Sequence, residues 1–168
     1  MGYTTDFSNS FSLNKPLSAI HSEYLLKFAG TRRVKRNQTI ASTLPDPARE
    51  AVGLPIGKQG AYFVGGGGDF GQANDASVID GNAAPSGQPG LWCQWVPTQD
   101  NNGIEWDGGE KFYDYVEWLS YIIEHFLMPW GYVLNGEVEW FGEDHSDRGK
   151  IVVANNVVST KTAKIVWE

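Results

Sequence analysis

The residues best suited to bind an anion form a basic run, in which Arg32, Arg33, Lys35 and Arg36 lie within five consecutive positions. Arginine guanidiniums bind phosphate oxygens in a bidentate fashion, and nearby aromatic rings attract and stack against charged ligands. We therefore expect a small phosphate-bearing, nucleotide-like ligand at this run. The ligand-binding residues predicted from the sequence are Arg32, Arg33, Arg36, Trp92, Trp106 and Lys111. The alternative is a solvated helix end, or a contact with the acidic half of the chain.

Residues 66–71 match the G-x-G-x-x-G pattern that binds dinucleotides. That chemistry requires a helix to begin at the pattern, so that backbone N–H groups meet the pyrophosphate. The residues that follow, 72–75, do not predict a helix, and a flexible loop is the simpler interpretation. We expect no cofactor.

Glu143, Asp144, His145 and Asp147 lie within five positions and carry the oxygen and nitrogen donors that divalent metals use. The same residue types are ordinary in turns between strands. No second histidine lies nearby. The cluster is therefore interpreted as a turn, and no metal site is predicted.

Catalytic arrangements are equally weak. Cys93 lies between two tryptophans in a predicted strand, which indicates a buried thiol rather than a reactive one. Glu137 and Glu139 are spaced to share one face of a strand, most simply the solvent face, and the same spacing relates Glu105 to Asp107. No catalytic residue is predicted, and a protein that is not an enzyme is favoured.

The hydrophobic pattern predicts the elements that must position these residues. Residues 8–13 predict a strand, and Ser18 caps a helix with a buried stripe of Ile20, Tyr24, Leu25 and Phe28, whose basic extension is the run at 31–36. Further predictions are a short helix at 49–52 and strands at 61–64 and 91–96.

The clearest element is an amphipathic helix at residues 110–128, with Asp107 placed three residues before Glu110 as in a capping box. An Asn135-Gly136 turn then predicts a hairpin over residues 132–140. Strands are expected at 150–153 and, after Asn155-Asn156, at 157–159 or 164–167. The fold class is α+β, a largely antiparallel sheet with one or two amphipathic helices packed on one face.

The composition of the chain limits its domain number, its partners and its cellular compartment. The 168 residues fit a single domain over 1–168, with a glycine-rich loop at about 65–90. Residues 1–90 carry eight Lys or Arg and seven Asp or Glu, a net +1, and residues 91–168 carry five and thirteen, a net −8. The acidic half makes nucleic acid an unlikely partner. There is no run of about 18 apolar residues to cross a membrane, and the single cysteine fits a reducing, cytoplasmic compartment.

Four segments carry a family resemblance: residues 92–97 (WCQWVP), 105–119 (EWDGGEKFYDYVEWL), 131–140 (GYVLNGEVEW) and 147–153 (DRGKIVV). Together they resemble a family of small uncharacterised proteins of bacteriophages and bacteria. The resemblance implies a phage or mobile-element origin and action in a bacterial host cell, and it transfers no catalytic residue.

The expected function is a non-enzymatic binding protein, such as a host-defence antagonist, that engages a host protein or sequesters a small anionic, nucleotide-like ligand. The alternatives are an enzyme acting on a nucleotide or sugar, and a virion structural or accessory protein. An acidic mimic of nucleic acid would need more charge than −7 over 168 residues. A homo-oligomer is left open.

Overall fold

The computed structural model describes residues 2–66 and 75–168. The chain forms two compact units. Unit 1 combines Met1–Leu17 with Gln94–Glu168, and unit 2 is Ser18–Cys93. From the sequence we expected one domain over residues 1–168, without a division into two units. No helix among the described residues is long and apolar enough to cross a membrane.

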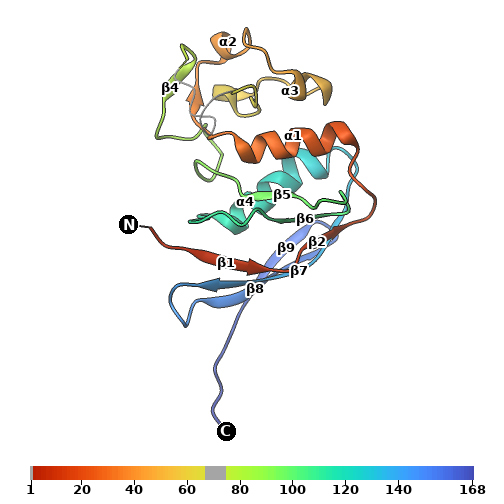
Figure 1. Cartoon of the computed structure of the whole chain (residues 1–168), viewed down its shortest axis with the longest axis vertical. Helices are drawn as coiled ribbons and strands as arrows, with labels where there is room; N and C mark the ends of the chain where they lie inside the picture. Colours follow the sequence, from red (N-terminus) through yellow and green to blue (C-terminus); the bar gives the residue numbers. More distant parts are fainter. Residues whose placement is uncertain (1, 67–74) are drawn as a thin grey trace. The chain divides into compact units, whose positions relative to one another are not determined.

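Unit 1 is built on an antiparallel sheet of seven strands (Figure 1), which confirms the predicted α+β class. Its strands are β1 (Thr5–Ser8), β2 (Phe11–Leu13), β5 (Trp95–Pro97), β6 (Gly103–Trp106), β7 (Leu134–Gly142), β8 (Arg148–Ala154) and β9 (Val157–Thr162). They lie in the order β5-β6-β2-β7-β8-β9, and β1 also pairs with β7.

The strand predicted at residues 8–13 is two strands that share one register. Thr5 lies opposite Gly142 and Leu13 opposite Leu134, so β1 and β2 follow β7 without a register shift. Between them Asn9 has φ 74°, a left-handed conformation that interrupts the extended backbone and that Asn tolerates better than most residues. Beyond this bend, β2 also pairs with β6.

The amphipathic helix is shorter than predicted. α4 spans Tyr115–Ile122 and continues as a π-helical segment over Ile123–Leu127. The predicted start at residue 110 is wrong, because Asp114 adopts a left-handed conformation (φ 56°) and the Asp107 carboxylate accepts a hydrogen bond from the Gly109 N–H instead of capping a helix.

The hairpin predicted at Asn135-Gly136 is also wrong. Both residues lie inside β7, where Asn135 pairs with Ser12 and Gly136 with Val153. The chain instead reverses between β7 and β8, at the polar segment predicted as a turn. The Asn155-Asn156 turn is confirmed, with positive φ at both residues, and it leads into β9.

Alternation along β7 and β8 gives the sheet two different faces. The inner face carries Val138, Trp140, Ile151 and Val153, all buried. The first turn of α4 covers this face: the Tyr115 ring lies 6.0 Å from that of Trp140, and its carbonyl accepts from Trp95 Nε1. The outer face carries the exposed Glu137 and Glu139, as the spacing predicted.

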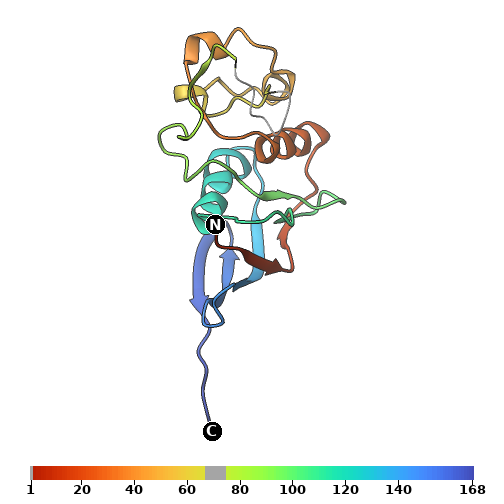
Figure 2. The ribbon, with the colours of Figure 1, turned by 60° about the vertical axis from the view of Figure 1, so that its left-hand side comes forward.

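After β9 the chain leaves the sheet as an extended tail, visible in Figures 1 and 2. Residues 163–168 are all exposed, and the Trp167 side chain is 91% exposed.

Unit 2 contains short elements joined by irregular backbone. They are α1 (Ala19–Gly30), β3 (Lys35–Arg36), α2 (Gln38–Ala41), α3 (Pro47–Ala51), a 3₁₀ turn (Lys58–Gly60) and β4 (Val78–Asp80), which pairs with β3. Ser18 caps α1 as predicted, by accepting from the His21 N–H.

Three details of unit 2 differ from the sequence expectations. Ile20, placed in the buried stripe of α1, is 45% exposed. The basic run is not a helical extension, because α1 ends at Gly30 and Lys35–Arg36 form a strand. No strand forms at residues 61–64. The G-x-G-x-x-G segment falls largely on residues 67–74, outside the described residues.

Candidate functional site

The basic run serves the interior of unit 2. Arg33 is only 2% exposed, and its guanidinium donates to the Phe63 and Ala61 carbonyl oxygens at 2.9 and 2.8 Å. It also lies 4.3 Å from the centre of the Phe28 ring. These carbonyls belong to the irregular backbone at residues 61–64, which pairs with no strand in the described part of the chain. Arg33 therefore satisfies buried backbone acceptors that the short elements of unit 2 leave unpaired.

Arg36 has a similar place. It is 2% exposed, forms an ion pair with Asp75 at 3.0 Å, donates to Ser77 Oγ at 2.8 Å and stacks over Phe63. Hydrogen bonds from Ser77 and Arg36 lower the pKa of Asp75 against a raising effect of burial, so this carboxylate stays ionised. Arg32 is partly exposed, and its guanidinium donates hydrogen bonds to the Gly81 carbonyl oxygen and to Asn82 Oδ1.

The other three predicted ligand-binding residues are divided between the units. Trp92 belongs to unit 2, with Arg32, Arg33 and Arg36, whereas Trp106 and Lys111 belong to unit 1. Trp106 Nε1 donates to Gln94 Oε1 and to the Gly109 carbonyl, and its ring packs 5.4 Å from that of Phe7. This tryptophan is half-buried, and it packs against the aromatic core of unit 1.

The acidic turn between β7 and β8 anchors the N-terminal segment. Asp147 accepts from Trp140 Nε1 at 3.0 Å and from the Tyr3 hydroxyl at 2.8 Å. Glu143 accepts from the Thr4 N–H, and Asp144 accepts from Ser146. No group of three or more His, Cys, Asp or Glu side chains able to hold a metal occurs among the described residues.

Neither the Cys93 thiol nor the His125 imidazole has the environment of a catalytic nucleophile or its base. Cys93 is fully buried, as its position between two tryptophans predicted. His125 lies in the π-helical segment and stacks on Tyr121 at 4.0 Å between ring centres. Burial lowers the pKa of His125, so the imidazole is neutral near pH 7.

A site that the sequence analysis missed lies on the outer face of the β7-β8-β9 sheet. Glu139, Lys150 and Lys161 are directly opposite one another across the three strands. Phe141 is opposite Arg148 in a second row. The row between them has Trp140, Gly149 and Thr162, whose side-chain positions point to the inner face because side chains alternate along a strand.

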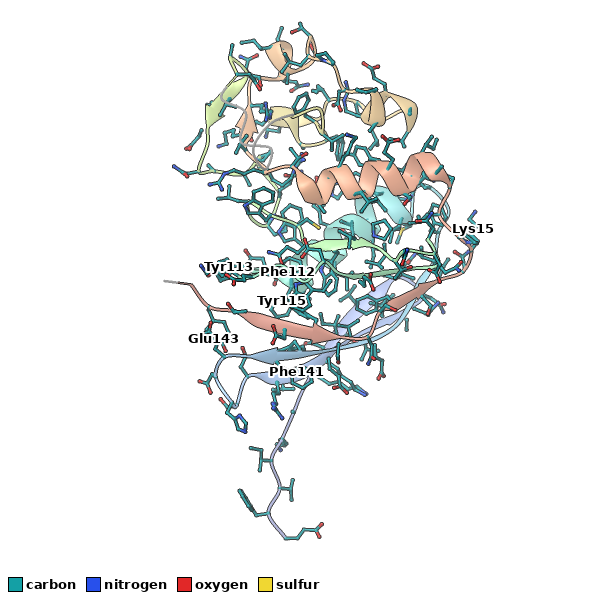
Figure 3. The ribbon with its side chains drawn as sticks, viewed as in Figure 1. Lys15, Phe112, Tyr113, Tyr115, Phe141 and Glu143 are labelled. Carbon is teal, nitrogen blue, oxygen red and sulfur yellow. The ribbon has the colours of Figure 1, made fainter. Side chains whose placement is uncertain are left out.

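The two rows of side chains therefore form the walls of a depression of about 370 Å³ across the strands. We call it the cationic trough. Its lining residues are Glu139, Trp140, Phe141, Arg148, Gly149, Lys150, Lys161, Thr162 and Ala163. Figure 3 shows Phe141 on the side of the sheet opposite Phe112 and Tyr115, so the ring is not part of the aromatic core.

The charges of the trough are only partly compensated. Lys150 forms an ion pair with Glu137 at 3.1 Å, and Arg148 lies 5.3 Å from the centre of the Phe141 ring. No acidic partner lies within ion-pair distance of Arg148 or Lys161 in the described part of the chain. Lys150 and Lys161 also face each other directly, an arrangement that like charges disfavour.

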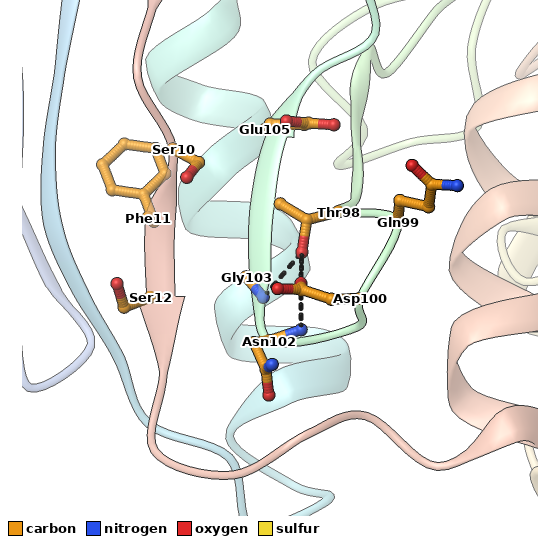
Figure 4. Close-up of a pocket in the computed structure, with 9 residues that line it drawn as sticks. All are labelled: Ser10, Phe11, Ser12, Thr98, Gln99, Asp100, Asn102, Gly103 and Glu105. Atoms are coloured by element: carbon orange, nitrogen blue, oxygen red, sulfur yellow. Dashed lines mark hydrogen bonds between the residues drawn. The ribbon is translucent and has the colours of Figure 1, made fainter.

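A second depression in unit 1, of about 570 Å³, has the opposite chemistry (Figure 4). We call it the polar depression. It lies between β2 and the loop joining β5 to β6, and its lining residues are Ser10, Phe11, Ser12, Thr98, Gln99, Asp100, Asn102, Gly103 and Glu105. None of them is cationic, so the polar depression does not suit a phosphate.

Comparisons of the chain with protein-family models, with curated protein sequences and with solved structures found no match.

A sequence signal for the trough did exist. Residues 148–167 contain four of the thirteen Lys and Arg side chains and no Asp or Glu. The net charge of −8 over residues 91–168 conceals this basic segment. The pairing of β8 with β9 then brings Arg148, Lys150 and Lys161 to one face, which only the strand register reveals.

Proposed function

We propose that the protein is a non-enzymatic binding protein that holds a small phosphate-bearing ligand in the cationic trough. The observation that supports this most directly is the position of Arg148, Lys150 and Lys161 around one depression on an open sheet face. A phosphate bound there would accept charge-assisted hydrogen bonds from these side chains. It would also relieve the repulsion between Lys150 and Lys161.

The ligand is nucleotide-like because the wall of the trough includes an aromatic ring. Phe141 is partly exposed, and Arg148 lies against it. A planar base can stack on such a ring or on the guanidinium, an interaction worth about 1–3 kcal/mol per base. The volume of about 370 Å³ falls within the usual range of small-molecule sites, roughly 300–1,000 Å³.

Binding without turnover is favoured by the residue types in the trough. The lining contains no histidine or cysteine. Glu139, the one carboxylate among the described residues of the lining, is exposed and lies opposite Lys150. A general acid or base needs a pKa adjusted by burial or by neighbours, and an exposed carboxylate beside an ammonium does not provide one. In the bacterial cytoplasm, such a protein would act by sequestering its ligand.

The test is isothermal titration calorimetry with AMP at low salt, comparing the wild type with the double variant Arg148→Gln/Lys161→Gln. The control is Lys15→Gln/Lys111→Gln, which removes two unit 1 cations away from the trough and changes the net charge equally. Loss of two partly exposed charge interactions should weaken binding about tenfold, and the control should change it less than twofold. Equal weakening by both pairs would reject the trough as the site.

The second candidate is engagement of a host protein, favoured by the tail after β9. Ile165, Val166 and Trp167 are 70%, 76% and 91% exposed, and contiguous exposed apolar side chains often mark a protein contact. A chain ending at Thr162 should then lose a partner that the full chain captures from bacterial lysate. A partner retained by the shortened chain argues against the tail.

A further inference from the structure

We propose that the polar depression binds a linear polyamine. This inference is independent of the proposed function, because the polar depression shares no residue with the cationic trough. It is drawn from the chemistry of the side chains that line the depression.

The lining is rich in hydrogen-bond acceptors and contains no Lys, Arg or His. Hydroxyls come from Ser10 and Ser12 on one wall, amides from Gln99 and Asn102 on the other, and a carboxylate from Glu105 on β6. An ammonium group has three donors and no acceptor. It therefore matches such a wall better than a phosphate does, since a phosphate would meet the carboxylates.

Asp100 supplies the second carboxylate and is ionised over a wide pH range. Its Oδ1 accepts from Thr98 Oγ1 at 2.7 Å and from the Asn102 N–H at 3.0 Å (Figure 4). These hydrogen bonds lower the pKa of Asp100. Both bonds use Oδ1, and the side chain is exposed, so an ammonium can reach this carboxylate from solvent.

The residue types of the lining favour a linear amine over a sugar as the ligand. Sugar sites commonly offer an aromatic face for the ring, but the one aromatic residue of the lining, Phe11, has a side chain with 0% exposure. The two carboxylates lie on different elements, Asp100 on the loop and Glu105 on β6. A chain with an ammonium at each end offers one donor group to each carboxylate.

The floor of the depression is fixed by a close approach of strands. A side chain at Gly103 would overlap the Phe11 carbonyl oxygen, so glycine is required where β2 and β6 meet. The Gly103 N–H donates to Thr98 Oγ1 at 3.0 Å. The walls are therefore preformed, and a ligand does not have to order them.

The test is calorimetry with spermidine in phosphate-free buffer at low salt. We expect saturable 1:1 binding that Asp100→Asn/Glu105→Gln weakens about fivefold to tenfold, the loss expected for two partly exposed ion pairs. Asp100→Asn keeps the Oδ1 acceptor and so preserves the loop. The control, Glu117→Gln/Glu124→Gln, removes two exposed carboxylates outside the lining and should weaken binding less than twofold.

Four results would overturn the proposal. Equal weakening by both variant pairs would show diffuse attraction to an acidic surface. Absence of saturable binding at millimolar spermidine would show no site. Binding of glucose that is weakened by the same Asp100 and Glu105 changes would assign the wrong ligand class. If circular dichroism shows that the double variant is unfolded, a second variant, Ser12→Leu, takes its place. It puts an apolar side chain on the opposite, exposed wall and should abolish spermidine binding. Unchanged affinity in that variant contradicts the proposal.

Discussion

Replacing Arg33 by methionine should destabilise the protein without touching any ligand. Methionine preserves most of the apolar stem that packs near Phe28, but it removes the donors to the Phe63 and Ala61 carbonyls. The Ala61 oxygen still accepts from Gln88 Nε2 at 2.6 Å, so the Phe63 oxygen is the group left unsatisfied.

The magnitude follows from these two bonds. Each hydrogen bond to a charged donor contributes about 1.5–3 kcal/mol, and a buried acceptor left unpaired costs about 1–3 kcal/mol. Part of this is offset, because the guanidinium no longer has to be taken out of water. A net loss of about 2–4 kcal/mol is expected, against a typical total stability of about 5–15 kcal/mol.

Urea denaturation followed by far-ultraviolet circular dichroism measures this loss. Arg32→Met is the control, since Arg32 is partly exposed and should cost less than about 1 kcal/mol. A loss of less than about 1 kcal/mol in Arg33→Met would show that these hydrogen bonds do not stabilise unit 2. Loss of AMP binding by the folded variant would show instead that the basic run is the ligand site.

Three further predictions concern other residues. Gly149→Ala should destabilise the folded protein by about 1–3 kcal/mol, because a Cβ at this position would overlap the Lys161 carbonyl oxygen and the Trp140 ring. Gly30 has open space around it, so the control Gly30→Ala should be nearly neutral in the same urea experiment. Burial lowers the pKa of His125 in the folded protein below the ordinary 6.5. As the pH drops, the unfolded chain therefore takes up the imidazole proton before the folded protein does, and the free energy of unfolding should fall from pH 6.5 down through the folded pKa. Histidine NMR signals that all titrate at or above 6.5 would contradict this. Burial, with nearby negative charge from Asp147, raises the pKa of Tyr115 in the folded protein to about 12. As the pH rises, the unfolded chain therefore loses the phenolic proton first, and the free energy of unfolding should decrease between pH 10 and about 12. If the absorbance titrations of the wild type and of Tyr115→Phe differed only near pH 10, the prediction would be wrong.

The class of fold could be predicted from the sequence because strand alternation and helix capping act over a few residues. Ser18 marks the start of α1, and Asn155-Asn156 marks the turn before β9. Where the predictions failed, a tertiary contact outweighed a local preference. Asn135-Gly136 has the composition of a tight turn, yet pairing with β2 on one side and β8 on the other holds both residues in a strand.

The candidate sites show the same limit more sharply. A run of arginines indicates an anion site only if the guanidiniums reach the surface, and burial is decided by neighbours distant in sequence. Phe63 and Ala61 lie about 30 positions beyond Arg33 and supply its acceptors. In contrast, Lys150 and Lys161 are eleven positions apart, and only the register of β8 and β9 places them opposite each other.

Mapping of backbone amide NMR shifts during titration with AMP locates the bound ligand residue by residue. The largest shifts are expected on the outer face of the β7-β8-β9 sheet, at Phe141, Arg148, Lys150, Lys161 and Ala163. They should be absent in the Arg148→Gln/Lys161→Gln variant and present in the Lys15→Gln/Lys111→Gln variant. Shifts centred instead on residues 32–36, or no saturable shift at millimolar AMP, would contradict a phosphate site in the cationic trough.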